Sequence, residues 1–238
     1  MTSRPKTVHG VTIGILMVRT RFRRHPGDIG HAGTWPFPVL YKVVEEATPD
    51  RMTRLQGDSL LEPFRRAARE LIAAGVDGIT TSCGFLSIYQ RELAETLDVP
   101  VATSSLLQVP MVERLIPSRR RVGILTYDSG ALTGPYLEAV GIAPDTPVQG
   151  MDPGSEFVRS IREGDGAVPF EVLRQEVLDT AGRFLAARPE VGALVLECTN
   201  LAPFSADLQE RFGLPVYDTV SLVEWFHAGL RPRRHARE

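Results

Sequence analysis

Several absences narrow the possible functions of this chain before any motif is considered. No stretch approaches 18 consecutive apolar residues, so no segment is expected to span a membrane. The first ten residues contain no apolar run of the kind found in signal peptides. We therefore expect a cytoplasmic protein. The net charge is only −2 at pH 7, which argues against nucleic acid as a main partner.

Residues that hold cofactors are equally scarce. Neither a CxxC nor an HxxxH spacing occurs, and the five histidines are scattered, which argues against a metal site. The only lysines are Lys6, in the N-terminal tail, and Lys42, in a long loop, so no lysine is well placed to bind pyridoxal phosphate. A glycine-rich phosphate-binding loop is also missing. The sequence therefore predicts chemistry that needs neither a metal nor another cofactor.

The apolar runs that are present predict an α/β protein with a mostly parallel sheet. Residues 11–18 and 121–127 are continuous apolar runs, which are typical of strands buried on both faces. Further strands are expected at 78–82, 99–103, 147–151, 193–197 and 215–217. Helices are expected at 60–74, with Ser59 as the cap, and at 87–97, 106–115, 134–140, 155–162, 170–187, 205–212 and 222–230. This alternation places helices on both faces of the sheet.

A long segment, residues 19–58, follows the first strand without a clear regular pattern. It is rich in proline, glycine, arginine and aromatic residues, and such insertions are usually functional loops or lids. Asp28, His31, Trp35 and Tyr41 lie within it. Two interpretations remain open: this segment closes over a ligand, or it packs on the edge of the domain.

The two cysteines occupy equivalent positions in an internal repeat. Cys83 and Cys198 each end a short apolar run, and they are 115 residues apart (198 − 83). The same offset aligns Leu86 with Leu201, and Pro100-Val101 with Pro215-Val216. We therefore expect two pseudo-symmetric α/β lobes, residues 1–115 and 116–230, followed by a basic tail at 231–238. The last helix of the first lobe is a candidate to cross over to the second.

These thiols are well placed for proton transfer at carbon. Ligands of parallel sheets bind outside the carboxyl ends of the strands, where both cysteines lie. A helix follows each cysteine, and its N–H groups would favour a thiolate and a bound carboxylate. One thiolate would remove a proton, and the opposite thiol would return one to the other face. The alternative is that both are small core residues, which is common for free cysteine.

Candidate substrate-binding residues surround these thiols or follow neighbouring strands. Glu197 precedes Cys198, and strand alternation would turn its side chain away from the thiol, so it is interpreted as a buried structural carboxylate. Arg19 follows the first strand and could pair with a carboxylate. The full set of candidates is Arg19, Thr20, Ser82, Gly84, Phe85, Tyr127, Thr199 and Asn200.

This arrangement resembles the aspartate/glutamate/hydantoin racemase superfamily over nearly the whole chain. In that superfamily the paired cysteines are the two acid/base residues, at positions that match Cys83 and Cys198. Cys198-Thr199-Asn200 is close to the second family motif, Cys-Thr followed by His or Glu. Cys83-Gly84-Phe85 departs from the first motif, Cys-Asn-Thr. The segments PGDIG and TWPFPV indicate one particular branch. The resemblance implies a two-lobed fold with the active site between the lobes and no cofactor.

The function implied is racemisation or epimerisation of an amino acid or related small carboxylate, with hydantoins and unsaturated diacids as further candidates. Maleate cis-trans isomerases share the scaffold and both cysteines, one as a nucleophile, and are the main alternative. Arylmalonate decarboxylases keep only the second cysteine, so Cys83 argues against that activity. A small-carboxylate binding protein without chemistry is the third interpretation. A homo-oligomer is compatible with all three.

Overall fold

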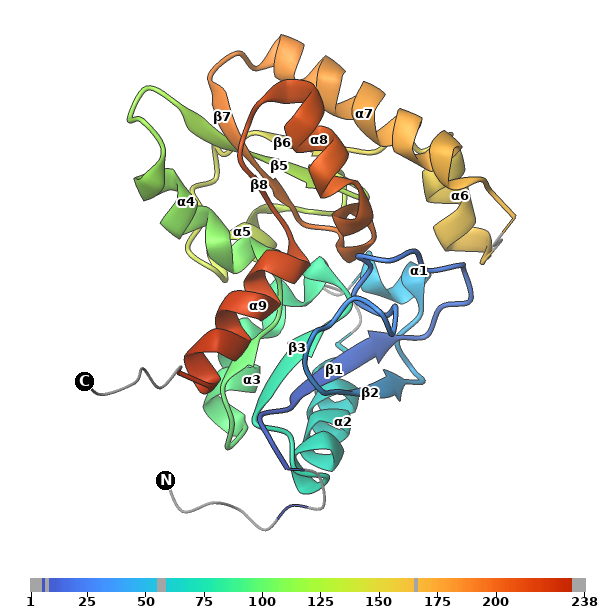
Figure 1. Cartoon of the computed structure of the whole chain (residues 1–238), viewed down its shortest axis with the longest axis vertical. Helices are drawn as coiled ribbons and strands as arrows, with labels where there is room; N and C mark the ends of the chain where they lie inside the picture. Colours follow the sequence, from blue (N-terminus) through green and yellow to red (C-terminus); the bar gives the residue numbers. More distant parts are fainter. Residues whose placement is uncertain (1–5, 7–8, 55–58, 165–166, 233–238) are drawn as a thin grey trace, which may run out of the picture.

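Two four-stranded parallel sheets, one in each half of the chain, form the frame of the molecule (Figure 1). The computed structural model describes residues 6, 9–54, 59–164 and 167–232. The first sheet has the order β2-β1-β3-β4 and comprises β1 (Ile13–Val18), β2 (Val39–Val44), β3 (Gly78–Thr81) and β4 (Val101–Ala102). The second has the order β6-β5-β7-β8 and comprises β5 (Arg121–Thr126), β6 (Val148–Gly150), β7 (Val191–Leu196) and β8 (Val216–Tyr217). The predicted fold of two similar α/β lobes is confirmed.

The central strands are buried because helices cover both faces of each sheet. All six residues of β1 and all four of β3 are buried, as the continuous apolar runs predict. The covering helices are α2 (Leu61–Ala73), α3 (Gln90–Thr96), α5 (Gly134–Glu138), α6 (Glu156–Glu163), α7 (Phe170–Ala187) and α8 (Ser205–Phe212). Their ends follow local sequence signals. The Ser155 hydroxyl accepts the Val158 N–H at the start of α6, which ends at Gly164 with φ +73°.

The two lobes exchange their last helices. Helix α4 (Val109–Leu115) comes from the first half, yet Val109 and Val112 pack in one cluster with Val122 and Val195 of the second sheet. Helix α9 (Thr219–Leu230) comes from the second half, and Val223 packs with β1 of the first sheet. In Figure 1, α9, in red, lies against the first lobe, and α4, in green, lies against the second. This exchange ties the lobes together.

Short 3-10 helices stand where continuous α-helices or loops are expected from the sequence. They are η1 (Gly84–Tyr89), η2 (Ser105–Gln108) and η3 (Thr199–Phe204). The elements η1 and η3 begin directly after Cys83 and Cys198. The helix expected at 87–97 therefore starts earlier and in a tighter form. Because 3-10 turns also leave their first N–H groups free, the expected N–H groups still follow each thiol.

The segment 19–58 contains more regular structure than its composition indicates. It includes the edge strand β2 and the short helix α1 (Pro49–Met52), which Pro49 starts with its fixed φ. Ser59 does not cap α2: Leu60 holds the capping position, and the Ser59 hydroxyl only accepts the Leu61 N–H at 3.5 Å. Residues 55–58 and, in the basic tail, 233–238 lie outside the described part of the chain.

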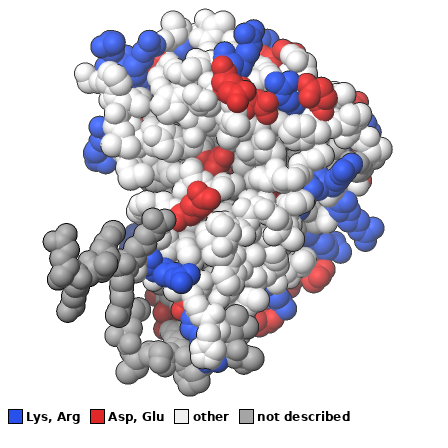
Figure 2. All heavy atoms as spheres, viewed as in Figure 1, with Lys and Arg blue, Asp and Glu red and all other residues white. Residues whose placement is uncertain are grey.

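Charged side chains of both signs are interspersed on the face shown in Figure 2. Across the described ranges, no helix combines the length and the apolar character that crossing a membrane requires.

Candidate active site

A cavity of about 60 Å³ lies between the carboxyl ends of the central strands of both sheets. Its walls include Val18 at the end of β1, Cys83 after β3, Tyr127 after β5 and Cys198 after β7. The fold therefore brings four strand ends from two lobes to one small space, at the position that parallel sheets use for ligands. The predicted residues that line it are Thr20, Ser82, Cys83, Gly84, Phe85, Tyr127, Cys198, Thr199 and Asn200.

Both cysteines are free thiols facing this cavity. Cys83 is partly exposed and Cys198 is buried. Each thiol accepts a hydrogen bond from the backbone N–H two residues later, Phe85 for Cys83 and Asn200 for Cys198, which lowers its pKa. Burial acts more strongly, and the carboxyl of Glu197 acts in the same direction, so the pKa of both thiols is raised above the usual range.

Hydrogen bonds across the cavity floor fix the two cysteine turns relative to each other. The Thr199 hydroxyl donates to the Ser82 carbonyl oxygen at 2.8 Å, joining the turn after β7 to the turn after β3. The Ser82 hydroxyl accepts the Val18 N–H at 2.8 Å. The Ser105 hydroxyl, from the first half, donates to the Leu196 carbonyl oxygen of β7 at 2.6 Å. Because these groups are buried and paired, they fix the turns that carry the two cysteines.

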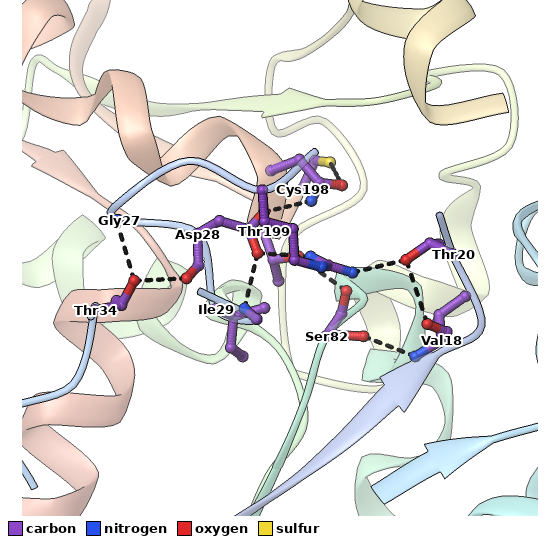
Figure 3. A network of polar contacts seen from close by, with 12 residues as sticks. Val18, Thr20, Gly27, Asp28, Ile29, Thr34, Ser82, Cys198 and Thr199 are labelled. Atoms are coloured by element: carbon purple, nitrogen blue, oxygen red, sulfur yellow. Dashed lines mark hydrogen bonds and ion pairs between the residues drawn. The ribbon is translucent and has the colours of Figure 1, made fainter. Parts of the chain in front are cut away.

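A chain of polar contacts connects the 19–38 loop of the first lobe to the thiol of the second (Figure 3). The Arg24 guanidinium donates to Asp28 Oδ1 at 2.6 Å and to the Thr20 hydroxyl at 2.8 Å. Asp28 Oδ2 accepts from the Asn200 amide at 2.7 Å, and the Cys198 thiol lies 3.6 Å from Asn200 Oδ1, to which it donates. The loop thereby orients the side chain that contacts the Cys198 sulfur.

The backbone of this loop packs closely on the second lobe. Gly27 has φ +93°, and a Cβ there would lie 3.1 Å from Pro203 Cα. On the other side of the loop, the Trp35 indole and the Tyr41 hydroxyl both donate to the Ile29 carbonyl oxygen, at 3.0 and 3.2 Å. These two aromatic residues therefore hold the loop in place. His31, the remaining candidate of this segment, accepts the Gly33 N–H at 3.1 Å in an exposed turn.

Glu197 faces the cavity, in contrast to the sequence interpretation that its side chain turns away. It lines the same cavity as both thiols and is 1% exposed. Strand alternation does not apply to it, because β7 ends at Leu196 and the chain turns at that point. The Thr126 hydroxyl donates to Oε2 at 2.6 Å. Burial raises the pKa of this carboxyl to about 7.

The structure does not bring Arg19 to the cavity: its side chain is exposed and is not part of the lining. Arg24 lines the cavity in place of Arg19, and its guanidinium lies 4.6 Å from the ring centre of Phe22. Sequence reasoning missed this residue because the chain folds back after β1 through an irregular loop. The Arg24-x-x-x-Asp28 spacing is the only signal that could have indicated the pair. Other lining residues it did not single out are Val18, Phe22, Pro49, Met52, Thr53 and Ile161.

Among the residues that the structure describes, no group of three or more histidine, cysteine, aspartate or glutamate side chains is arranged to hold a metal ion. The groups that face the cavity are instead two thiols, one carboxyl, one guanidinium, hydroxyls and aromatic rings. This set of groups is suited to binding a small organic acid and moving protons on it.

Comparison with known families and sequences gives one family and one group of relatives. The family model described as Asp/Glu/Hydantoin racemase matches residues 66–225. A dimethylsulfoniopropionate lyase of Durusdinium sp. clade D is 26% identical over 226 residues, covering 92% of this chain and 74% of the relative. Dimethylsulfoniopropionate lyase 5 of Emiliania huxleyi (strain CCMP1516) is 28% identical, covering 91% of this chain and 45% of the relative. The chain thus spans only about half to three quarters of these relatives.

Solved structures share the fold. Allantoin racemase from Klebsiella pneumoniae superposes with a TM-score of 0.64 at 16% identity, covering 96% of both chains. A mutant of arylmalonate decarboxylase in a sulfate-associated form superposes with a TM-score of 0.62 at 19% identity, covering 95% of this chain and 96% of the other. At these identities the likeness is one of architecture.

Proposed function

Since the chain belongs to the Asp/Glu/hydantoin racemase family, we propose that it moves the α-hydrogen of a small carboxylate between Cys83 and Cys198 without a cofactor. Racemisation or epimerisation of an amino acid or a related acid is the reaction that this arrangement supports best. The observation that carries the proposal is the pair of free thiols at equivalent strand ends, on the wall of one cavity.

The steps follow from the groups around the cavity. The thiolate of one cysteine takes the α-hydrogen: the C–H bond breaks, an S–H bond forms, and the electron pair moves onto the substrate carboxylate. In this proposal the Arg24 guanidinium, which lines the cavity, and the N–H groups that begin η1 and η3 stabilise this added negative charge. The other thiol then gives its proton to the opposite face of the carbon, so that an S–H bond breaks and a C–H bond forms.

Elimination from a 3-substituted propionate is a second candidate, favoured by the similarity to dimethylsulfoniopropionate lyases. The first step is the same removal of an α-hydrogen. The carbon–sulfur bond then breaks, the electron pair leaves with the neutral sulfide, and a double bond forms between the α and β carbons. Phe22, Phe85 and Tyr127 line the cavity, and aromatic rings attract a cation such as a sulfonium group.

A solvent-exchange screen tests the proposal. The protein is incubated in D2O with amino acids, hydantoins, diacids and dimethylsulfoniopropionate, and α-deuterium, released sulfide and maleate conversion are measured in parallel. Deuterium uptake with inversion supports the racemase, and sulfide release supports the lyase. Turnover of maleate without α-exchange would replace both with a cis-trans isomerase. No exchange and no turnover on any class would contradict the proposal and favour a carboxylate-binding protein.

A further inference from the structure

The carboxyl of Glu197 has no part in the two-thiol mechanism, yet it lies in the same cavity. Its Oε2 accepts from Thr126, while Oε1 is buried and has no hydrogen-bond partner among the residues that the structure describes. A buried oxygen left without a partner costs about 1–3 kcal/mol. A buried, unpaired oxygen on a carboxyl whose residue lines the cavity beside the thiols is therefore expected to have a partner during the reaction.

Gly84 makes the space that this carboxyl occupies. A Cβ at position 84 would clash with Glu197 Oε1 and with the Glu197 carbonyl oxygen. The family motif carries an asparagine after its first cysteine, where this chain has Gly84. Gly84 and Glu197 belong together, because the side chain absent after Cys83 leaves room for a carboxyl that precedes Cys198. The Glu197 carboxyl thus lies next to the turns that carry both cysteines.

We propose that Glu197 is the shared proton acceptor of the two thiols. Its Oε1 takes the proton of one thiol, so that an S–H bond breaks, an O–H bond forms, and the negative charge moves from the carboxylate to the sulfur. After the α-hydrogen has been transferred, the same oxygen returns its proton to the thiolate left on the opposite side. The three groups share one negative charge before and after the transfer, and that charge lies on the substrate while the intermediate exists. This role deepens the proposed function and depends on it.

The surrounding charges support such an exchange. Burial raises the pKa of Glu197 to about 7, while hydrogen bonds from the Thr126 hydroxyl and the Tyr127 backbone lower it, and no cation contributes. The Arg24 guanidinium is already paired with Asp28 at 2.6 Å, and Tyr127 is the remaining titratable group on the cavity wall. The ionised carboxylate raises the pKa of both thiols, so a thiol gives up its proton more easily when that carboxylate becomes neutral at the same time.

Thiol alkylation as a function of pH tests this coupling without any substrate. The probe is iodoacetamide, with labelling of Cys83 and Cys198 resolved by mass spectrometry between about pH 5 and pH 9. In the wild type, the logarithm of the rate should rise with pH, bend near pH 7 as Glu197 ionises, and then level off. In Glu197→Gln the bend should disappear, and labelling above pH 7 should be faster than in the wild type because the repelling charge is gone.

Two further variants separate coupling from structural damage. Thr126→Val removes the hydroxyl that stabilises the carboxylate, so the bend should move to higher pH. Glu113→Gln changes a carboxyl that accepts the Val122 N–H at 3.0 Å, away from the cavity lining, and should leave the bend unchanged. Circular dichroism confirms that each variant is folded. The wild-type profile needs no variant, so the proposal stays falsifiable even if Glu197→Gln does not fold.

A wild-type profile without a bend would overturn the proposal, as would a bend that persists unchanged in folded Glu197→Gln. The outcome is independent of the exchange screen above. If the alkylation profile shows the bend but no substrate exchanges its α-hydrogen, Glu197 shares a proton with the thiols and the proposed function is contradicted. If α-exchange occurs but the profile shows no bend, the proposed function holds and Glu197 has no part in it. If both the α-exchange and the bend are observed, Glu197→Gln should lower kcat by about 10²-fold with KM little changed. Glu197→Asp should restore part of the lost kcat.

Discussion

The two lobes present the same thiol at the same place but surround it differently. Cys83 and Cys198 follow equivalent strands, precede equivalent 3-10 helices, and accept equivalent backbone hydrogen bonds. The residues before them differ. The Ser82 hydroxyl accepts the Val18 backbone N–H, whereas Glu197 brings a carboxyl to the cavity. The duplicated fold fixes where the thiols stand, and the residues that differ decide what each thiol contacts.

The distinguishing contacts of each thiol come largely from the opposite lobe. The loop of the first lobe reaches Cys198 through Asp28 and Asn200. The carboxyl of Glu197, from the second lobe, packs against Gly84 beside Cys83. Each of these contacts needs both lobes. We infer that association of the lobes adds to the difference that the residues next to each thiol already make.

Removing either thiol should have the largest effect on the reaction rate. Cys83→Ser and Cys198→Ser should each lower the rate of racemisation by about 10²–10⁴-fold, because a serine hydroxyl is too weak an acid to replace a thiol near neutral pH. Initial rates with the natural substrate identified by the exchange screen check this. Near-wild-type rates in both variants would mean that the matching cysteines are only a trace of duplication.

Disturbing the contact from the loop should affect one thiol and spare the other. Asp28→Asn breaks the ion pair between the buried Asp28 and the partly buried Arg24, which costs on the order of 3 kcal/mol of unfolding free energy when the arginine charge is left alone. It also weakens the hold on Asn200. Urea unfolding should show the loss of stability, and alkylation of Cys198 should change more than that of Cys83. Equal changes at both thiols would remove the asymmetry that we infer.

The carboxyl found only in the second repeat should make stability depend on pH. The pKa of Glu197 is raised from 4.5 to about 7 in the folded protein, so the unfolded chain ionises first as pH rises. The wild type should lose on the order of 3 kcal/mol relative to Glu197→Gln between about pH 4.5 and pH 7, and nothing further above that. Urea unfolding of both proteins across this range measures it. A constant difference would contradict the raised pKa.

The smallest effect is expected for Arg19, whose side chain is exposed to solvent. Arg19→Ala should change kcat/KM by less than about twofold, as for other exposed substitutions. Arg24→Lys is the matched comparison and should raise KM, because an ammonium group cannot keep both the Asp28 and the Thr20 contacts in the same geometry. A larger effect at Arg19 than at Arg24 would move the carboxylate-binding group outside the cavity.

The sequence predicted the parts of this molecule that depend on local pattern. Continuous apolar runs gave the central strands, and the 115-residue offset gave the matching lobes and the two thiols. Residues next to the cysteines, such as Ser82 and Thr199, were found because neighbours in the chain remain neighbours at a strand end.

What it did not predict depends on contacts between distant segments. Arg24 reaches the cavity only because its loop folds back over the second lobe, and no local pattern encodes that path. Glu197 was assigned to the wrong side because alternation assumes that the strand continues, whereas β7 ends one residue earlier. The signal for its position is Gly84, because a residue with a side chain there would clash with the carboxyl.

The stereochemistry of α-hydrogen exchange tests the central claim most directly, that the two thiols act on opposite faces of one carbon. Each folded serine variant keeps one thiol, so Cys83→Ser and Cys198→Ser should each exchange the α-hydrogen of only one enantiomer, or only one of the two hydrogens of a CH2 group, in D2O. NMR of the recovered substrate measures this. We predict opposite preferences in the two variants. The same preference in both variants, or none in either, would contradict the account.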